Sequence, residues 1–248
     1  NLSQANQNEE VLAFRDINNS LRSKTWVYLK HSKDEVRSIQ KMAERSGFLV
    51  HVMRGKDGSE ESFKALGAGK SSPQVIHLAT HGFFFPDNTN SKPAFGSSSY
   101  NALPLFTTSD HPMMRSGLIL SGGNVAWLGG RSTGKREDGV LTAYEISQMN
   151  LSNTELVVLS ACETGLGDIQ GNEGVFGLQR AFKIAGARYL IMSLWKVPDL
   201  ETSEFMKTFY QYWLEKKKTI PEAFNITQQE MKKRFINPSQ WAGFVLIE

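Results

Sequence analysis

The sequence predicts an α/β fold in which a mainly parallel central sheet of about six strands carries helices on both faces. Two short apolar runs, at residues 75–79 and 156–159, have the pattern of strands buried on both faces. The segments between such runs carry apolar residues at helical spacing. Strands that alternate with helices are typical of a parallel sheet whose two faces are covered.

Most segments of the chain show a period that can be assigned to a helix or a strand. Residues 33–46 have helical spacing, and Gly47 stands where a glycine commonly ends a helix. A helix is expected to begin near Thr142, because Glu145 three residues later completes a capping box. The other expected strands are 26–29, 48–53, 117–121, 188–195 and 241–247, and the other expected helices are 59–66, 174–185, 200–216 and 221–235.

Two stretches are predicted to be long loops, because they have no persistent period. Residues 86–116 are crowded with Pro, Ser, Asn and Gly, and residues 122–139 are rich in glycine and charge. Long loops in compact domains are usually functional or disordered. Residues 1–24 are polar and are expected to form an N-terminal arm or the end of a preceding region, with one domain over 25–248.

The composition excludes several classes of protein. Lysine and arginine total 28 against 25 acidic residues, which gives no electrostatic case for nucleic acid binding, and the lysine runs near 216 and 232 are expected on solvated helix faces. No apolar run reaches the roughly 18 residues of a membrane span. The polar start is not a signal peptide, and its lack of Met indicates a fragment of a longer chain. A single cysteine favours a reducing compartment, so we expect a cytoplasmic location.

Cys162, the one cysteine, directly follows the buried run 156–159 and two small residues, and glycines that permit a sharp turn come after it. A lone cysteine is often only a small buried hydrophobe. However, His81 follows the other buried run, and the carboxyl ends of parallel strands share one edge of a sheet. An imidazole can lower the pKa of a thiol, and the amides of Gly82 and Cys162 are candidate donors to an oxyanion.

The other motifs give little indication of a functional site. His77 lies inside a strand pattern and is predicted to be a hydrogen-bonded core histidine. The phosphate-loop spacing at residues 129–135 is attributed to chance, because Arg136 stands where Ser or Thr should bind magnesium. His77 and His81 lack the glutamate of a zinc-protease helix, and no other group has metal-ligand spacing. We therefore expect neither a metal nor a cofactor.

Four motifs resemble the CHAT family, caspase-like peptidases usually found behind tetratricopeptide repeats. They are HLATHGFF, LSACETGLG, GNEGVFGLQRAF and GARYLIMSLWKVPD, and the similarity runs in order from about Lys33 to Glu248. The resemblance implies a caspase-type fold with a Cys–His dyad. By residue, it implies that His81 is the general base, Cys162 the nucleophile and Gly82 an oxyanion donor.

Substrate-binding residues rest on the same resemblance. In related enzymes such as separase, an acid just past the strand at 188–195 lies at the floor of the first specificity pocket, and Asp199 is similarly placed. It would favour Arg or Lys before the scissile bond. The alternative is that Asp199 caps the helix that follows. Glu163 is a second candidate pocket acid. Ser193 to Trp195 are expected to pair with a substrate backbone, and core packing is as good an explanation of Trp195.

These observations together predict a cysteine endopeptidase that cleaves a protein substrate after Arg or Lys and is regulated by an upstream repeat region or partner. A non-cleaving scaffold and a hydrolase or transferase of small thioesters or amides are the alternatives. The loops could act as a lid or be cut by the enzyme itself. The candidate positions for such cuts are Arg115, Arg131, Lys135 and Arg136.

Overall fold

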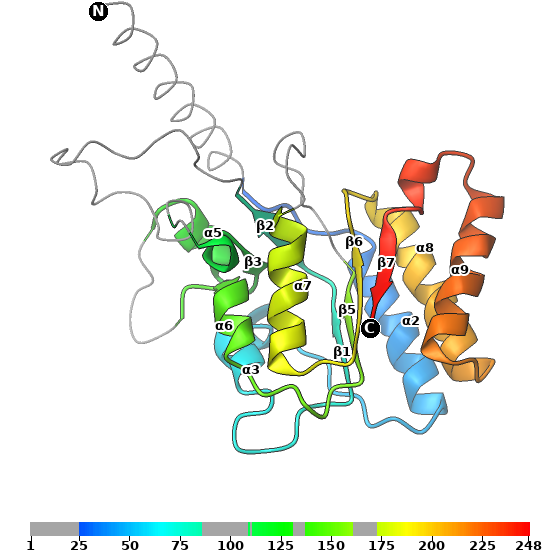
Figure 1. Cartoon of the computed structure of the whole chain (residues 1–248), viewed down its shortest axis with the longest axis horizontal. Coiled ribbons are helices and arrows are strands. Elements are labelled where there is room, and N and C mark those ends of the chain that lie inside the picture. The colour runs from blue at the N-terminus through cyan, green and yellow to red at the C-terminus, as the bar shows by residue number, and fades with distance from the viewer. Residues whose placement is uncertain (1–24, 86–108, 110, 131–136, 161–172) are drawn as a thin grey trace, which may run out of the picture.

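The computed structural model describes residues 25–85, 109, 111–130, 137–160 and 173–248. Within these residues the chain forms one four-stranded and one three-stranded sheet. Figure 1 shows the larger sheet nearly edge-on between two groups of helices, with α6 and α7 on one side and α2, α8 and α9 on the other. The predicted α/β class, with a mainly parallel sheet and helices on both faces, is confirmed.

The central sheet has the strand order β1-β5-β6-β7. Its strands are β1 (Val75–Leu78), β5 (Leu156–Leu159), β6 (Tyr189–Ser193) and β7 (Phe244–Ile247). The first three are parallel, and β7 is antiparallel to β6. In the described part of the chain this sheet has four strands and not the expected six, because three further strands form a sheet of their own.

Alternation along the central strands supplies both cores. Leu156 and Val158 of β5 pack in a cluster with α2, α8 and α9, while Val157 and Leu159 pack in a cluster with α3, α6 and α7. All four β5 side chains are buried, because the strand lies between two neighbours and under helices on both faces. The continuous apolar run at 156–159 therefore reports a strand with two covered faces.

The helices have the following bounds. The main ones are α2 (Ser32–Arg45), α3 (Glu60–Lys64), α5 (Gly123–Trp127), α6 (Ala143–Ser147), α7 (Glu173–Ala185), α8 (Asp199–Tyr210), which continues as a π-helical turn (Gln211–Glu215), and α9 (Ile220–Arg234), and the 3₁₀ turns are Gly55–Asp57, Pro112–Met114 and Pro238–Gln240.

Several predicted helix ends are confirmed. Gly47 follows α2 with a φ of 88°, a conformation that only glycine adopts cheaply. Thr142 caps α6, and the Glu145 carboxylate accepts in return from the Thr142 amide at 2.9 Å.

The smaller sheet is antiparallel and has the order β2-β3-β4. Its strands are β2 (His81–Phe84), β3 (Ser116–Ile119) and β4 (Val140–Thr142). A third apolar cluster packs between this sheet and α5, and the fully buried Trp127 contributes to it. His81 therefore does not end a parallel strand, as the sequence suggested, but begins β2 three residues after β1 has ended.

Other expectations were wrong locally. Residues 26–29 and 48–53 form no strand; the main chain of Trp26 bonds to a side chain instead, and Leu49 is fully exposed. The stretch 122–139 is not wholly a loop, because it contains α5. Of the stretch 86–116, residues 86–108 and 110 lie outside the described residues, and 112–114 form a 3₁₀ turn.

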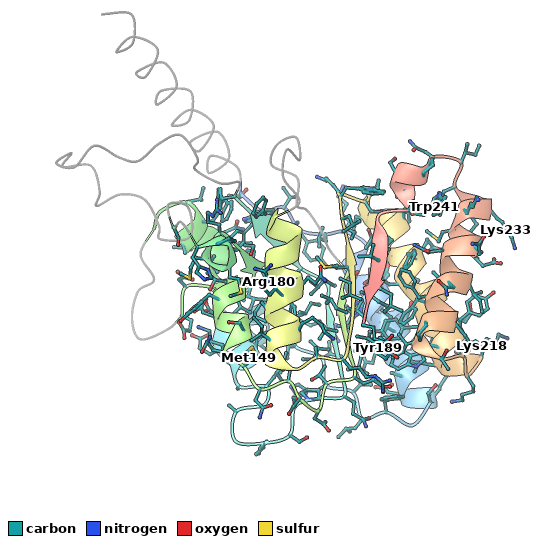
Figure 2. The ribbon with its side chains drawn as sticks, viewed as in Figure 1. Met149, Arg180, Tyr189, Lys218, Lys233 and Trp241 are labelled. Atoms are coloured by element: carbon teal, nitrogen blue, oxygen red, sulfur yellow. The ribbon has the colours of Figure 1, made fainter. Side chains whose placement is uncertain are left out.

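Both lysine runs are exposed, but only Lys232 and Lys233 lie on a helix as expected, because Lys216 to Lys218 form the connection before α9. Figure 2 shows Lys233 on α9 and Lys218 at the connection that precedes it, both on the side away from the sheet, and both are exposed. None of the helices that the structure describes combines the length and hydrophobicity needed to cross a bilayer.

Because β6 lies at the centre of the sheet, its side chains should matter most for stability. Ile191 is 0% exposed, so we expect Ile191→Ala to lower the free energy of unfolding by about 2–5 kcal/mol. Ile236, which is 100% exposed, is the matched control, and its change to Ala should cost less than about 0.5 kcal/mol. Urea denaturation measures both, and equal midpoint shifts would contradict the buried position of β6.

Candidate active site

The strands β1 and β5 end side by side at one edge of the central sheet. Their parallel register pairs Leu78 with Leu159, and the Ser160 amide donates to the Leu78 carbonyl at 2.9 Å. His81 follows Leu78 by three residues. Cys162 follows Ser160 by two residues, and both it and Glu163 lie outside the described residues. The structure therefore describes the histidine half of the predicted dyad and the strand that leads to the cysteine.

His81 is oriented by a main-chain carbonyl. Its ring is buried, and Nε2 lies 2.6 Å from the carbonyl oxygen of Val27. A carbonyl only accepts hydrogen bonds, so Nε2 carries the proton. In a neutral imidazole the lone pair is then on Nδ1, which is the atom able to take a proton from another group. The indole of Trp26 packs against the same ring, with 5.0 Å between ring centroids.

The amide of Gly82 points away from β3. Phe85 donates to the Arg115 carbonyl at 2.8 Å, so that pair is hydrogen-bonded. Hydrogen-bonded and non-bonded pairs alternate along an antiparallel ladder, which makes the Gly82–Leu118 pair non-bonded. Because β2 is an edge strand, the Gly82 N–H is directed to the outer side of the sheet, as an oxyanion donor would need to be.

Residues 26–31, which we call the leading segment, connect His81 to two other elements. Asn124 of α5 binds both main-chain groups of Trp26: Oδ1 accepts from the Trp26 amide at 2.8 Å, and Nδ2 donates to the Trp26 carbonyl at 3.2 Å. At the other end, the Asp199 carboxylate accepts from the His31 amide at 2.8 Å. In Figure 1 this blue segment runs from beside β2 to the start of α2.

Asp199 is half-buried in the first turn of α8, and the N-cap position is taken by Pro198. Asp199 is therefore not the helix cap that the sequence also allowed. Its carboxylate joins the start of α8 to the start of α2, and a carboxylate with one such bond retains further acceptor positions.

Ser193 and Trp195 both contact the segment leading into β7. Ser193 is buried and pairs with Phe244, and the Leu194 amide donates to the Gly243 carbonyl at 2.8 Å. The Trp195 indole donates to the Ser239 carbonyl at 2.9 Å and covers Gly243, where a Cβ would come within 2.8 Å of the ring. β7 thus occupies one main-chain edge of β6, and β5 pairs with the other edge as far as Ile191.

A buried polar network lies beneath the end of β5. The Glu35 carboxylate of α2 accepts from the Ser160 hydroxyl and from His77 Nε2, the latter at 2.8 Å. The Tyr210 hydroxyl lies 3.2 Å from His77 Nδ1. Burial and the nearby Glu35 charge raise the pKa of Tyr210, which keeps this hydroxyl neutral. His77 is therefore a hydrogen-bonded core histidine, as predicted.

Sequence reasoning missed Glu35, Val27 and Asn124. Glu35 did leave a signal, because it stands on the apolar stripe of its helix with Ile39 and Met42, the other buried residues of α2. An acid at such a position needs a buried partner. Val27 contributes only a main-chain carbonyl, and Asn124 lies in a stretch interpreted as a loop, so neither could be found from side-chain periodicity.

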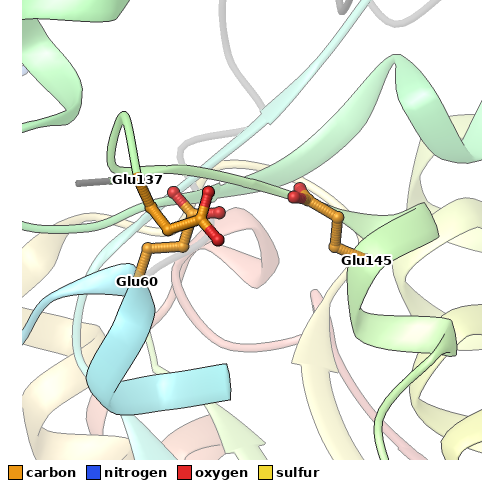
Figure 3. A group of neighbouring side chains, drawn as sticks. All are labelled: Glu60, Glu137 and Glu145. Carbon is orange, nitrogen blue, oxygen red and sulfur yellow. The ribbon is translucent and has the colours of Figure 1, made fainter. Parts of the chain in front are cut away.

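Three carboxylates converge between α3 and α6, with Lys64 among them. Figure 3 shows Glu60, Glu137 and Glu145 pointing toward one another, and their oxygens lie within 4.8 Å of each other. The Lys64 ammonium contacts them at 2.6, 3.0 and 2.7 Å respectively. Because a lysine already supplies the positive charge, the cluster is an ion-pair network that fixes residues 137–139 against α3, and it carries no case for a metal.

Burial and pairing act in opposite directions on these groups. Burial raises the pKa of Glu60. Burial would also raise that of Glu145, but bonds from Lys64 and Thr142 outweigh it and hold the pKa of Glu145 below its usual value. Burial would lower the pKa of Lys64, yet its bonds to Glu145, Glu60 and Glu137 raise it instead.

Arg115 is a poor candidate for self-cleavage. It is 1% exposed, and its main chain bonds to Phe85 and Pro112. A protease needs an exposed and extended main chain, so this expectation was wrong. Arg131, Lys135 and Arg136 lie outside the described residues.

Comparisons with known proteins agree with the motifs. The model of the CHAT domain matches residues 1–248. Tetratricopeptide repeat protein 28 of Mus musculus is 28% identical over 231 residues, which cover 83% of this chain and 8% of that protein. The Homo sapiens protein of the same name is 36% identical over 111 residues, or 44% of this chain and 4% of its own length. The chain therefore spans less than a tenth of the length of these curated relatives.

The ion-pair network leads to a test of stability against pH. Glu60 is 2% exposed, so Lys64→Met should leave its charge uncompensated and cost about 3 kcal/mol at pH 7.5. The contribution of Glu145, whose pKa is lowered, is present above the unfolded-state pKa and is lost as the pH falls through the folded-state value. The deficit of the variant should therefore shrink between pH 7.5 and pH 4. Urea denaturation at both pH values measures it. Lys233→Met, on an exposed face, is the control, and a deficit independent of pH would refute the network.

Proposed function

Because the chain belongs to the CHAT domain family, whose fold is caspase-like, we propose that it is a cysteine endopeptidase with His81 as general base and Cys162 as nucleophile. The hydrogen bond between His81 Nε2 and the Val27 carbonyl carries the proposal. It selects the tautomer whose Nδ1 can accept the thiol proton.

The reaction follows from these roles. Cys162 transfers its proton to His81 Nδ1, and the thiolate attacks the peptide carbonyl carbon. The imidazolium then gives that proton to the leaving amine, which departs with the C-terminal part of the substrate. Water hydrolyses the thioester that remains, with His81 accepting a proton from it, and the free thiol is restored.

The amides of Gly82 and Cys162 are the proposed oxyanion donors. The outward direction of the Gly82 N–H supports the first of them. Such donors act in a site that excludes water, where they stabilise the charge that develops in the transition state.

Specificity for Arg or Lys is assigned to Asp199, with Glu163 as a second candidate. Asp199 holds the leading segment, the same segment that orients His81, which supports a position next to the dyad. Ser193 and Trp195 are proposed to pair with the substrate main chain through the edge that β7 does not occupy.

Regulation is assigned to the region that precedes the domain. The curated relatives are named as tetratricopeptide repeat proteins, and a repeat region upstream would sense a trigger and control the domain. Residues 25–248 are proposed as the peptidase domain and residues 1–24 as an arm. The protein substrate belongs to the cytoplasm in this proposal, where a free thiol stays reduced.

Catalysis is tested by removing the thiol from the full-length protein. We expect Cys162→Ala and His81→Ala to lower cleavage by at least about a thousandfold, because members of a dyad act as a unit. Labelling of new N-termini, after incubation with extract from cells that express neighbouring genes, detects the cuts. A binding scaffold of this fold would give the same N-termini with wild type and Cys162→Ala.

Specificity is tested by removing the charge of Asp199 while its hydrogen bond is kept. An asparagine oxygen can still accept from the His31 amide, so Asp199→Asn should fold. For peptides with Arg or Lys before the cut, we expect kcat/KM to fall about ten- to a hundredfold, the loss of one charged hydrogen bond. Peptides with norleucine at that position should be unaffected.

Glu204→Gln, which neutralises another acid of α8, is the control for this change and should alter neither peptide series. An undiminished preference for Arg and Lys in Asp199→Asn would remove Asp199 from the specificity pocket.

A further inference from the structure

The leading segment is held over His81 at its two ends, Trp26 and His31. The side chains of Val27 and Tyr28 are 71% and 67% exposed, so they do not anchor it. The position of the Val27 carbonyl is fixed instead by the main-chain bonds and the ring packing of the adjacent Trp26 on one side, and by the main-chain bond of His31 on the other.

We propose that Asn124 is a positioning residue for the general base, acting through the main chain of Trp26 and Val27. The inference rests on the proposed function, because it assigns a role in that reaction. Asn124 does not touch His81. It fixes the carbonyl that does.

The side-chain amide of Asn124 binds both main-chain groups of Trp26, and we call this pair of hydrogen bonds the clamp. The Trp26 amide donates to Asn124 Oδ1 at 2.8 Å, and its carbonyl accepts from Nδ2 at 3.2 Å. A neighbouring strand would bind a residue in the same two-point way. The Trp26 carbonyl belongs to the planar peptide group that leads into Val27. Only the two backbone dihedrals of Val27 therefore remain between the clamp and the Val27 carbonyl, which accepts from His81.

The clamp is itself on a rigid support. Asn124 is the second residue of α5, and at Gly123 a Cβ would come within 2.5 Å of the Gly139 carbonyl oxygen, so the helix start lies directly against the chain entering β4. Trp127, at the end of the same helix, is 1% exposed and packs edge-on against Trp26 with 4.9 Å between centroids. α5 thus holds the Trp26 main chain with one residue and its ring with another.

The chemistry of the clamp requires an amide. Aspartate has the size of asparagine and would still accept from the Trp26 amide, but it has no donor for the Trp26 carbonyl and would place a charge against it. Alanine removes both bonds. Both variants should loosen the Val27 carbonyl, and His81 would then populate the tautomer that carries its proton on Nδ1, which cannot act as the base.

Two measurements test the proposal, and the first does not depend on cleavage. In the Cys162→Ala background, long-range ¹H–¹⁵N NMR of the imidazole reports which ring nitrogen carries the proton. We expect the Nε2–H tautomer with Asn124 present and a mixture in Asn124→Ala and Asn124→Asp. The control is Asn225→Asp, a change at an exposed position of α9, which should leave the tautomer unchanged.

The second measurement is steady-state cleavage by the full-length protein. We expect kcat to fall about ten- to a hundredfold in both variants, with KM changed less than about twofold, because the clamp orients the base and does not bind substrate. If Asn124→Ala fails to fold, Asn124→Asp, which keeps the size and one bond, decides the question.

An unchanged tautomer in both variants overturns the proposal, and so does a rise in KM with kcat intact. Absence of any cleavage by the wild type would refute the peptidase function instead. A shift of the tautomer would still establish the action of Asn124 on His81.

Discussion

The parallel register of β1 and β5 brings the ends of the strands that precede His81 and Cys162 to one edge of the central sheet. It brings Leu78 and Ser160 within one hydrogen bond of each other at the same edge of the sheet. The two segments that carry His81 and Cys162 both leave the sheet from that point. A shift of either strand by one residue would turn its buried side chains to the opposite cluster, so the two apolar cores hold this register.

The buried network around Glu35 reinforces the same edge from below. The Glu35 carboxylate of α2 joins β1 and the residue after β5, and His77 of β1 extends the network to Tyr210 of α8. Charged groups in an interior are costly unless they are paired and hydrogen-bonded, and removing one partner costs more than the pair contributes. The network therefore favours one arrangement of these elements, and with it one position for Ser160 at the end of β5.

Much of the fold could be predicted, because its elements have local signals. The strands at 75–78 and 156–159, the capping box of Thr142 and Glu145, and the glycine after α2 each follow from residue type and spacing. Only the second run is buried along its whole length, because β1 is an edge strand in which Ile76 alone is buried. The predictions that were wrong concerned segments whose structure depends on hydrogen bonding to residues distant in the sequence. His81 and Gly82 look like the end of a parallel strand until β3 is seen beside them, and 26–29 look like a strand although a side chain, Asn124, takes the place of a neighbouring strand.

The candidate site also contains residues that the sequence indicates and residues that only the tertiary structure reveals. His81, Gly82 and Asp199 could be proposed from the sequence, because their side chain, or the lack of one, carries the signal. The partner of His81 could not be, since a main-chain carbonyl is present at every residue and is selected only by tertiary structure.

Because the leading segment contributes a backbone oxygen, position 27 should tolerate almost any residue during divergence, whereas the number of residues between 26 and 31 should not vary. Asn124 and Asp199, which bond to the two ends of the segment, lie on different helices. An inserted or deleted residue would therefore move the Val27 carbonyl oxygen away from the His81 imidazole. Spacing, and not residue identity, is the feature by which this part of the site would be inherited.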